Sequence, residues 1–220
     1  MSVSAEHAVE TTVTLQPPAD PAPLGLAAFA LTTFLLSAKN AGWMTHATGS
    51  AWLGYAFAYG GLAQLLAGMW EFRNRNVFGA TAFGSYGAFW IGLGLYIQLV
   101  VNPAVAAIKP ATAAVTVSSI NHDLGWILLA FFIFNTYMLI LSSQANLAVF
   151  LVFLTLGITE IILSIGNFNA GAALAPTGTI KFGGYVGLVT ALVAWYTSFA
   201  LVSRGMDGKI KLPVGAALVK

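Results

Sequence analysis

The chain has 220 residues, of which 58% are hydrophobic and only 7% are charged, and its formal net charge is +2. A soluble domain carries about a quarter charged residues, so this composition excludes a water-facing surface around one core and indicates a protein that spans a lipid bilayer. The nine basic residues are scattered, the three histidines lie far apart and cysteine is absent, so the sequence predicts no nucleic-acid partner, no metal site and no cofactor.

The first 22 residues are polar and end in the proline-rich stretch PPADPAP. Such a segment cannot bury an apolar core, so residues 1–22 are predicted to form a flexible tail. It lacks the basic start and apolar stretch of a signal peptide. Residues 23–203 are predicted to form one transmembrane domain, and residues 204–220 a cytoplasmic C-terminal tail.

Six apolar runs follow the tail, each long enough to cross a hydrocarbon core of about 30 Å as a helix. Runs near 20 residues without strict alternation favour helices over barrel strands. The predicted fold class is therefore an all-α integral membrane protein with six transmembrane helices. The predicted spans are Leu24–Met44, Ala51–Trp70, Gly79–Val101, His122–Leu141, Leu147–Ile165 and Phe182–Val202.

An even number of spans puts both termini on one side of the membrane, and the basic residues then separate into two sets. The loops on the other side hold only Lys109 and Lys181, whereas the loops and tail on the side of the termini hold Arg73, Arg75, Arg204, Lys209, Lys211 and Lys220. The positive-inside bias places both termini in the cytoplasm. A multi-pass protein of the cell's plasma membrane is expected.

The first span contains proline and glycine in DPAPLGL, followed by the polar stretch LTTFLLSAKNAG. This pattern favours a helix that starts or breaks inside the protein. Its free N–H groups, with Thr32, Thr33 and Asn40 nearby, would bind a carboxylate without a full positive charge. The alternative is a kinked but inert helix whose hydroxyls bond to their own backbone.

Two acidic residues stand out. Glu160 lies within an apolar span, where a charge costs about 2.5 to 3.5 kcal/mol, so it is a candidate for proton exchange. The alternative is a buried acid that a neighbouring helix satisfies. Glu71 directly follows the second span and precedes Arg73 and Arg75, which favours a loop ion pair.

Other polar residues inside the spans have two open interpretations, interhelical hydrogen bonds or the lining of a pathway. These are Gln64, Gln98, Asn102 and Asn135. The sequence has no arrangement of nucleophile, base and orienting group, and no phosphate-binding loop. It therefore argues against an enzyme.

Three blocks of sequence resemble a known family. They are DPAPLGLAAFALTTFLLSAKNAG at 20–42, YGGLAQLLAGMWEFRNRNVFGATAFGSYGAFW at 59–90, and AVFLVFLTLGITEIILSIGN at 148–167. The first two are similar to the NPAPLGL signature and the second and third spans of the acetate uptake transporter family, the acetate and succinate permeases of bacteria, archaea and fungi. The resemblance covers roughly residues 20–203. It implies a six-helix protomer that assembles as a homohexamer, each protomer moving acetate and related short carboxylates, generally with a proton.

The resemblance also implies roles for individual residues. Motif positions make Phe29, Tyr86 and Leu156 a hydrophobic constriction, which excludes hydrated ions while the tyrosine hydroxyl offers one hydrogen bond to a carboxylate. Core packing would give the same pattern. Matching positions suggest further pore or substrate contacts at Thr32, Thr33, Asn40, Gln64 and Ser85.

Two positions depart from the family pattern. Asp20 replaces the asparagine of the signature, and Glu160 stands where an apolar or aromatic residue is usual. An ionised acid at the pore mouth would repel acetate, so the substrate role of the first position does not transfer directly, and Glu160 is a hypothetical site of proton coupling. Three functions remain open: a proton-driven carrier of acetate or succinate, an anion channel for acetate, and a membrane sensor without transport.

Overall fold

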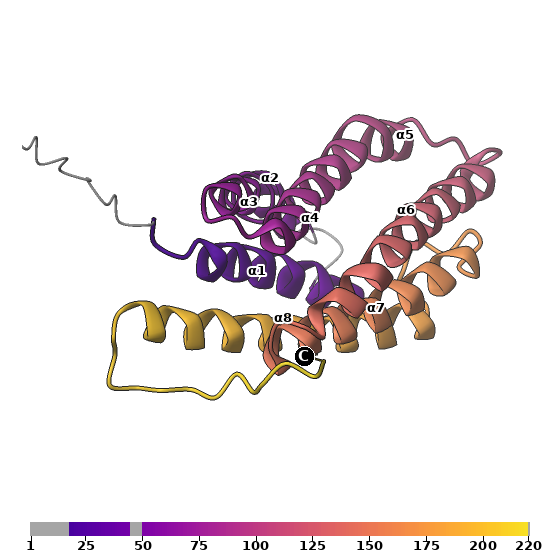
Figure 1. The fold of residues 1–220 in the computed structure, drawn as a ribbon. Coiled ribbons are helices and arrows are strands. Elements are labelled where there is room, and N and C mark those ends of the chain that lie inside the picture. Colours follow the sequence, from indigo (N-terminus) through magenta and orange to yellow (C-terminus); the bar gives the residue numbers. More distant parts are fainter. Residues whose placement is uncertain (1–17, 45–49, 220) are drawn as a thin grey trace, which may run out of the picture.

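The computed structural model describes residues 18–44 and 50–219, and every regular element in these residues is helical (Figure 1). Most of the polar segment 1–22, together with His7, His46 and Lys220, lies outside the described residues. The first segment is α1 (Ala22–Asn40). The second segment consists of α2 (Ala51–Phe57), the π-helix η1 (Ala58–Ala63) and α3 (Gln64–Arg73). The third segment consists of α4 (Val77–Tyr96), the π-helix η2 (Ile97–Val101) and α5 (Asn102–Ala106). The remaining helices are α6 (Ala113–Ser142), α7 (Leu147–Phe168) and α8 (Gly178–Gly205).

The helices confirm a multi-pass membrane architecture. Five of them are long and apolar enough to cross a bilayer, and they correspond to the predicted first, third, fourth, fifth and sixth spans. The predicted second span is also helical over residues 51–73, but η1 divides it and it is not among those five. The largest difference between predicted and observed helix bounds is at the start of α6. This helix begins at Ala113, so residues 113–121 extend the fourth helix instead of forming a loop.

The predicted break in the first span is absent, because α1 runs without interruption from Ala22 to Asn40. Its prolines lie in the first turn, where a missing N–H costs nothing, and the amide of Ala22 donates to Asp20 Oδ1 at 2.9 Å. At 1.5 Å per residue, Thr32 lies about 15 Å along the axis from Ala22. The start of α1 is therefore not beside Thr32, and the irregular turns are in the second and third segments.

Small residues let α1 lie at the centre of the bundle, between α8 on one side and the second segment on the other (Figure 1). A methyl group at Gly184 of α8 would lie 2.8 Å from the backbone carbon of Asn40. Between α3 and α4, a methyl group at Gly68 would lie 2.6 Å from the backbone nitrogen of Gly84. These helices touch through their backbones, as small residues permit in a membrane.

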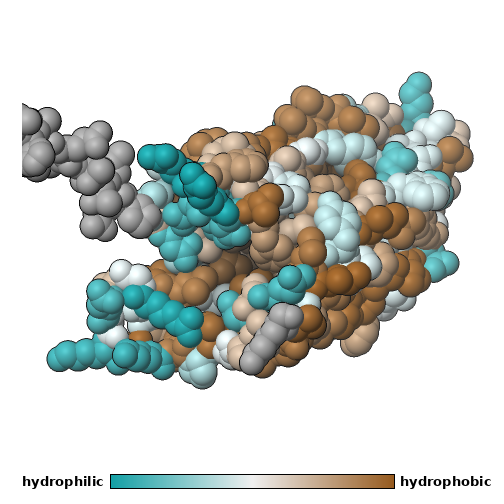
Figure 2. All heavy atoms as spheres, in the orientation of Figure 1, coloured by the Kyte–Doolittle hydropathy of each residue, from teal (hydrophilic) through white to brown (hydrophobic). Residues whose placement is uncertain are grey.

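A band of apolar side chains covers the outer face of the bundle, and hydrophilic residues gather mainly at its ends (Figure 2). Large exposed apolar residues include Leu99, Ile133, Ile140, Leu192 and Phe199. In water such a surface would be unfavourable, so it faces lipid or other protein.

The C-terminal segment turns back beside the bundle after α8 (Figure 1). The amide of Ala148 donates to the carbonyl of Val214 at 2.9 Å, and the amide of Leu218 donates to Ser143 at 2.8 Å. The Tyr196 hydroxyl donates to the carbonyl of Pro213 at 2.7 Å. This segment is therefore attached to the connection between α6 and α7 and to α8.

Candidate functional site

A cavity of about 650 Å³ opens at the end of the bundle where the termini lie. Its wall is mainly apolar and is built mostly by α1, α4, α6 and α7, with contributions from α3 and α8. Phe29, Tyr86 and Leu156, here called the constriction residues, all contribute to it. They come from three different helices, so only the tertiary fold brings them together.

A second cavity, of about 530 Å³, opens at the opposite end of the bundle. Two lysines and several amide side chains line it: Lys39, Lys181, Asn40, Asn121 and Asn167. Those of α1 and α7 lie about three turns beyond the residues of these helices that line the first cavity.

The two cavities follow one another along the same helices. Five helices contribute to both cavities: α1, α4, α6, α7 and α8. One end of each helix lines the first cavity, and its other end, or the residues next to that end in the chain, lines the second. On α1, the first cavity ends at Phe29 and the second begins at Leu36, a distance of about 10 Å along the helix. The closed part of the bundle between them contains residues 30–35, 87–92, 129–136 and 157–162.

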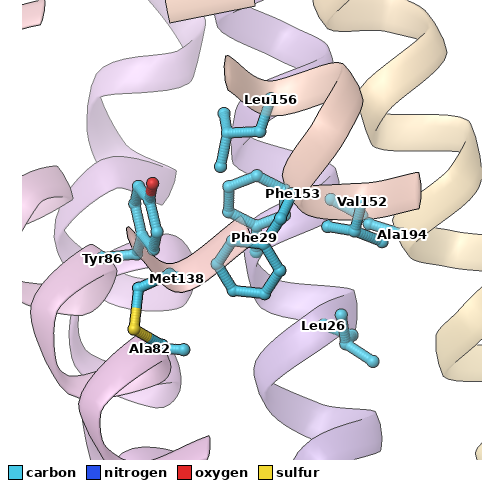
Figure 3. Packing of buried hydrophobic residues seen from close by; sticks show 10 residues of the cluster. Leu26, Phe29, Ala82, Tyr86, Met138, Val152, Phe153, Leu156 and Ala194 are labelled. Carbon is cyan, nitrogen blue, oxygen red and sulfur yellow. The ribbon is translucent and has the colours of Figure 1, made fainter. Parts of the chain in front are cut away.

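The inner end of the first cavity is closed by aromatic side chains around Tyr86. Its ring lies edge-on to Phe29, with centroids 5.9 Å apart, and it also contacts Phe134 at 5.4 Å and Phe131 at 5.8 Å. Figure 3 shows Tyr86 facing Phe29 and Leu156 across the bundle, with Phe153 beside them. All three constriction residues are buried.

A hydrogen-bonded group of polar side chains lies just behind this aromatic closure. The Tyr86 hydroxyl is 3.0 Å from Asn135 Oδ1 and 3.2 Å from Glu160 Oε1, and the Asn135 amide donates to the carbonyl of Phe153 at 2.9 Å. A tyrosine hydroxyl has one hydrogen and therefore donates to one acceptor at a time. If Glu160 carries a proton, it donates to the Tyr86 oxygen while Tyr86 donates to Asn135, and the three groups form one chain.

Glu160 lies on α7 between the residues that line the two cavities. It lies four residues after Leu156, which lines the first cavity, and three before Leu163, which lines the second, so all three share one face of the helix. It is 4% exposed, and its Oε2 has no hydrogen-bond partner among the described residues. The interpretation as a buried acid satisfied by neighbouring helices therefore accounts for only one of its two oxygens.

The five other predicted contacts are distributed unevenly. Gln64 is buried at the first cavity and Asn40 lines the second, whereas Thr32, Thr33 and Ser85 line neither. Thr32 Oγ1 donates to the carbonyl of Ala28 at 3.1 Å, the backbone bonding given above as the alternative. Their roles in substrate contact stay predictions.

The predicted ion pair of Glu71 is wrong. Glu71 is fully buried, and its Oε2 accepts a hydrogen bond from the side-chain amide of Asn76 at 3.0 Å. No ion pair of Glu71 with Arg73 or Arg75 is present in this described part of the chain. Asn76 also caps α4 through a bond from the Gly79 amide. Glu71 lies in the last turn of α3, on the side of the helix that lines the first cavity.

Sequence reasoning missed Asn76 as a member of this cavity wall, and also Met138 and Phe153. Asn76 had a detectable signal, because asparagine directly before an apolar run is a typical helix cap. Met138 and Phe153 had none, since they are ordinary apolar residues of helices whose facing surfaces the sequence does not reveal.

The fold and these cavities define a multi-pass helical membrane protein with two aligned cavities separated by a closed aromatic segment. The chain belongs to the GPR1/FUN34/yaaH family, whose model matches residues 7–216. This confirms the family resemblance seen in the sequence.

Two relatives illustrate the similarity. Acetate permease A of Emericella nidulans is 40% identical over 199 residues, which cover 89% of this chain and 65% of the permease, so the chain spans somewhat less than two thirds of that relative. The succinate-acetate/proton symporter SatP of Escherichia coli strain K12 is 32% identical over 197 residues, which cover 90% of this chain and 95% of SatP.

A solved structure of the bacterial acetate channel SatP has the same fold. It matches this chain with a TM-score of 0.74 and 31% identity, over 90% of this chain and 99% of the other.

Proposed function

We propose that this protein moves acetate and related short carboxylates across the plasma membrane through the two cavities of each protomer, with residues 23–203 as the transport domain. The observation that carries the proposal is the alignment of the cavities along the same helices, with the constriction at the inner end of the first cavity and the closed part of the bundle, which holds Asn135 and Glu160, between them. The names of the relatives, an acetate permease and a succinate-acetate/proton symporter, support acetate and succinate as substrates.

The constriction suits a small anion that must leave as readily as it enters. Phe29 and Leu156 exclude hydrated ions because they offer nothing to replace lost water. The Tyr86 hydroxyl is a single neutral donor. It would break its hydrogen bonds with Asn135 and Glu160 in order to donate to a passing carboxylate. A neutral donor binds the anion without trapping it.

Proton coupling is assigned to Glu160. A carboxylate in this apolar, closed part of the bundle is costly, and no described cation contacts it, so it would enter the transport cycle as the neutral acid. Release of its proton beside the substrate would link the two movements. This supports a carboxylate/proton symporter.

A channel for the same anions is the second candidate, and the matching structure described as an acetate channel favours it. The difference is measurable, because only a coupled carrier accumulates its substrate against a gradient. A non-transporting sensor remains the outcome if neither activity is present.

The orientation and assembly of the protein are also part of the proposal. The positive-inside bias supports cytoplasmic termini, so the first cavity would open to the cytoplasm and the second to the outside. The apolar outer band supports contacts with lipid and with further copies, and a homohexamer is proposed from the family resemblance.

The test is uptake of labelled acetate by proteoliposomes that contain the full chain, with and without an inward proton gradient. Tyr86→Ala is measured beside it, and protein-free vesicles are the control. Accumulation above equilibrium that requires the gradient supports the symporter. Uptake that only equilibrates, and that Tyr86→Ala alters, supports the channel. If uptake does not depend on the protein, the transport proposal is overturned.

A further inference from the structure

We propose that the second cavity contains a carboxylate-binding subsite, in which Lys39, with Lys181 at the rim, captures the anion before it reaches Tyr86. The inference deepens the proposed function by assigning the residue that loads the substrate. It rests on the positions of two lysines in the wall of one cavity and on the absence of an acidic residue from the described part of that wall.

Lys39 is held at the wall of the second cavity by an aromatic surface. Its Nζ lies 5.7 Å from the ring centroid of Trp52, which is itself buried against Trp90. A cation–π contact fixes one side of an ammonium group and leaves its other N–H groups free to donate. In this position the free side meets the cavity that Lys39 lines.

Lys39 is not needed to cap α1, although it lies in the last turn. The amides that follow the helix already satisfy its last carbonyls, because Ala41 donates to Ser37, Gly42 to Lys39 and Trp43 to Ala38. Gly42 has a φ of +83°, the left-handed conformation with which glycine ends helices. The hydrogen-bond capping of α1 therefore does not require the lysine, and what its charge gains from the helix dipole leaves its N–H groups free to donate.

Lys181 is equally hard to explain as a structural residue. It lies in the first turn of α8, where the helix dipole disfavours a positive charge. A methyl group at Gly42 would lie 3.6 Å from Lys181 Cε, so the side chain reaches across to the turn after Lys39. Both lysines line the same cavity.

The two cavities differ in the sign of their charges. The second has two lysines and no acidic residue in its described wall, whereas the first has Asp20 and Glu71 and no basic residue. Asp123 is the acidic residue described at the second end, and it accepts from the Tyr96 hydroxyl at 3.1 Å. Residues 45–49, outside the described part, contain no acidic side chain. Field lines concentrated in such a cleft raise the local concentration of an anion.

The direct test measures binding without transport. The full-length protein in detergent is treated at pH 7.5 with formaldehyde and a reducing agent, which methylate accessible amines, and each lysine is quantified by peptide mass spectrometry. We expect sodium acetate to slow the modification of Lys39 at least threefold, and sodium chloride at equal ionic strength to have little effect. Lys109 is the control, because it is exposed at the same end and does not line the cavity.

Equal slowing by chloride, or no slowing at Lys39, would overturn the subsite, whether or not the protein transports acetate. If Lys39 is protected but no uptake occurs, the subsite stands and the proposed function fails.

In a protein that transports, Lys39→Gln should raise the half-saturating acetate concentration at least fivefold with little change in maximal rate. Lys39→Arg keeps the charge and should recover most of the affinity. Lys109→Gln is the matched control and should have the same half-saturating acetate concentration as the wild type. A wild-type half-saturating concentration in Lys39→Gln would overturn the proposal, and the Arg variant separates loss of charge from misfolding.

Discussion

The hydroxyl of Tyr86 lies 3.2 Å from Oε1 of Glu160, although the two residues are 74 positions apart in the chain. This contact joins α4 to α7 in the closed part of the bundle, directly behind Phe29 and Leu156. It places the hydroxyl of Tyr86 in contact with the one acidic side chain of the described spans that lies between the cavities. In the proposed symporter, the carboxylate and the proton would therefore meet at this contact.

Tyr86→Phe removes this hydroxyl and keeps the aromatic ring. Asn135 Oδ1 and Glu160 Oε1 then lose a buried partner, so we expect a loss of about 1 to 3 kcal/mol in the free energy of unfolding. Thermal unfolding in detergent should show a Tm lower by several degrees. Tyr96→Phe is the control, because its bond to Asp123 is exposed and its loss should change Tm little. Equal Tm values for the two variants would contradict the network.

Glu160→Gln keeps a neutral side chain that hydrogen-bonds to Tyr86 but cannot exchange a proton. In the symporter, we expect the pH dependence of acetate uptake between pH 5 and 8 to become flatter and accumulation to be lost, while exchange of labelled for unlabelled acetate continues. Uptake is measured in proteoliposomes at several external pH values. An unchanged pH profile in this variant would show that Glu160 does not couple the proton.

Glu71 gives the protein a dependence of stability on pH. It lies one residue beyond the apolar stretch that ends at Trp70. Burial raises its pKa to about 7 from the ordinary 4.5, the hydrogen bond from Asn76 opposes this rise, and the nearby charge of Asp20 adds to it. Because the folded-state pKa is the higher one, stability is fully present below pH 4.5 and is lost as the pH rises toward 7.

The loss amounts to at most about 3 kcal/mol, since one pKa unit corresponds to about 1.4 kcal/mol. Glu71→Gln keeps the acceptor for Asn76 and removes the charge. Its Tm should therefore vary less than that of the wild type between pH 5 and 8, with the larger gain at pH 8. If the two proteins lose the same Tm over this range, another group causes the dependence.

Gly87 and Gly92 of α4 provide a matched pair for the close packing of helices. A methyl group at Gly87 would lie 2.7 Å from the backbone nitrogen of Leu65, whereas nothing lies within 4 Å of one at Gly92. Gly87→Ala should lower the free energy of unfolding by about 1 to 3 kcal/mol because the α3 backbone must move. Gly92→Ala should be neutral or slightly stabilising, since alanine is the better helix former. Thermal unfolding distinguishes the two, and equal effects would mean that α3 and α4 are farther apart.

The sequence predicted the helices well where hydropathy alone decides them. Long apolar runs have only one solution in a bilayer, a helix that satisfies its own backbone, so the spans and most of their bounds could be read directly. At DPAPLGL the pattern predicted a helix that starts or breaks, and the structure has only the start, because its prolines lie at the beginning of α1. Prediction from the sequence failed at Glu71, because α3 continues to Arg73 and hydropathy does not tell which face of a helix end is buried.

The family motifs named the constriction residues, and the composition of the chain determined that it belongs in a membrane. Only the tertiary structure decided that Tyr86, Asn135 and Glu160 share hydrogen bonds, that one cavity is acidic and the other basic, and that Lys39 faces the latter. The reason is physical. Hydropathy fixes where each helix lies in the bilayer, but the rotation of each helix depends on how glycine and small residues of several helices fit together at once.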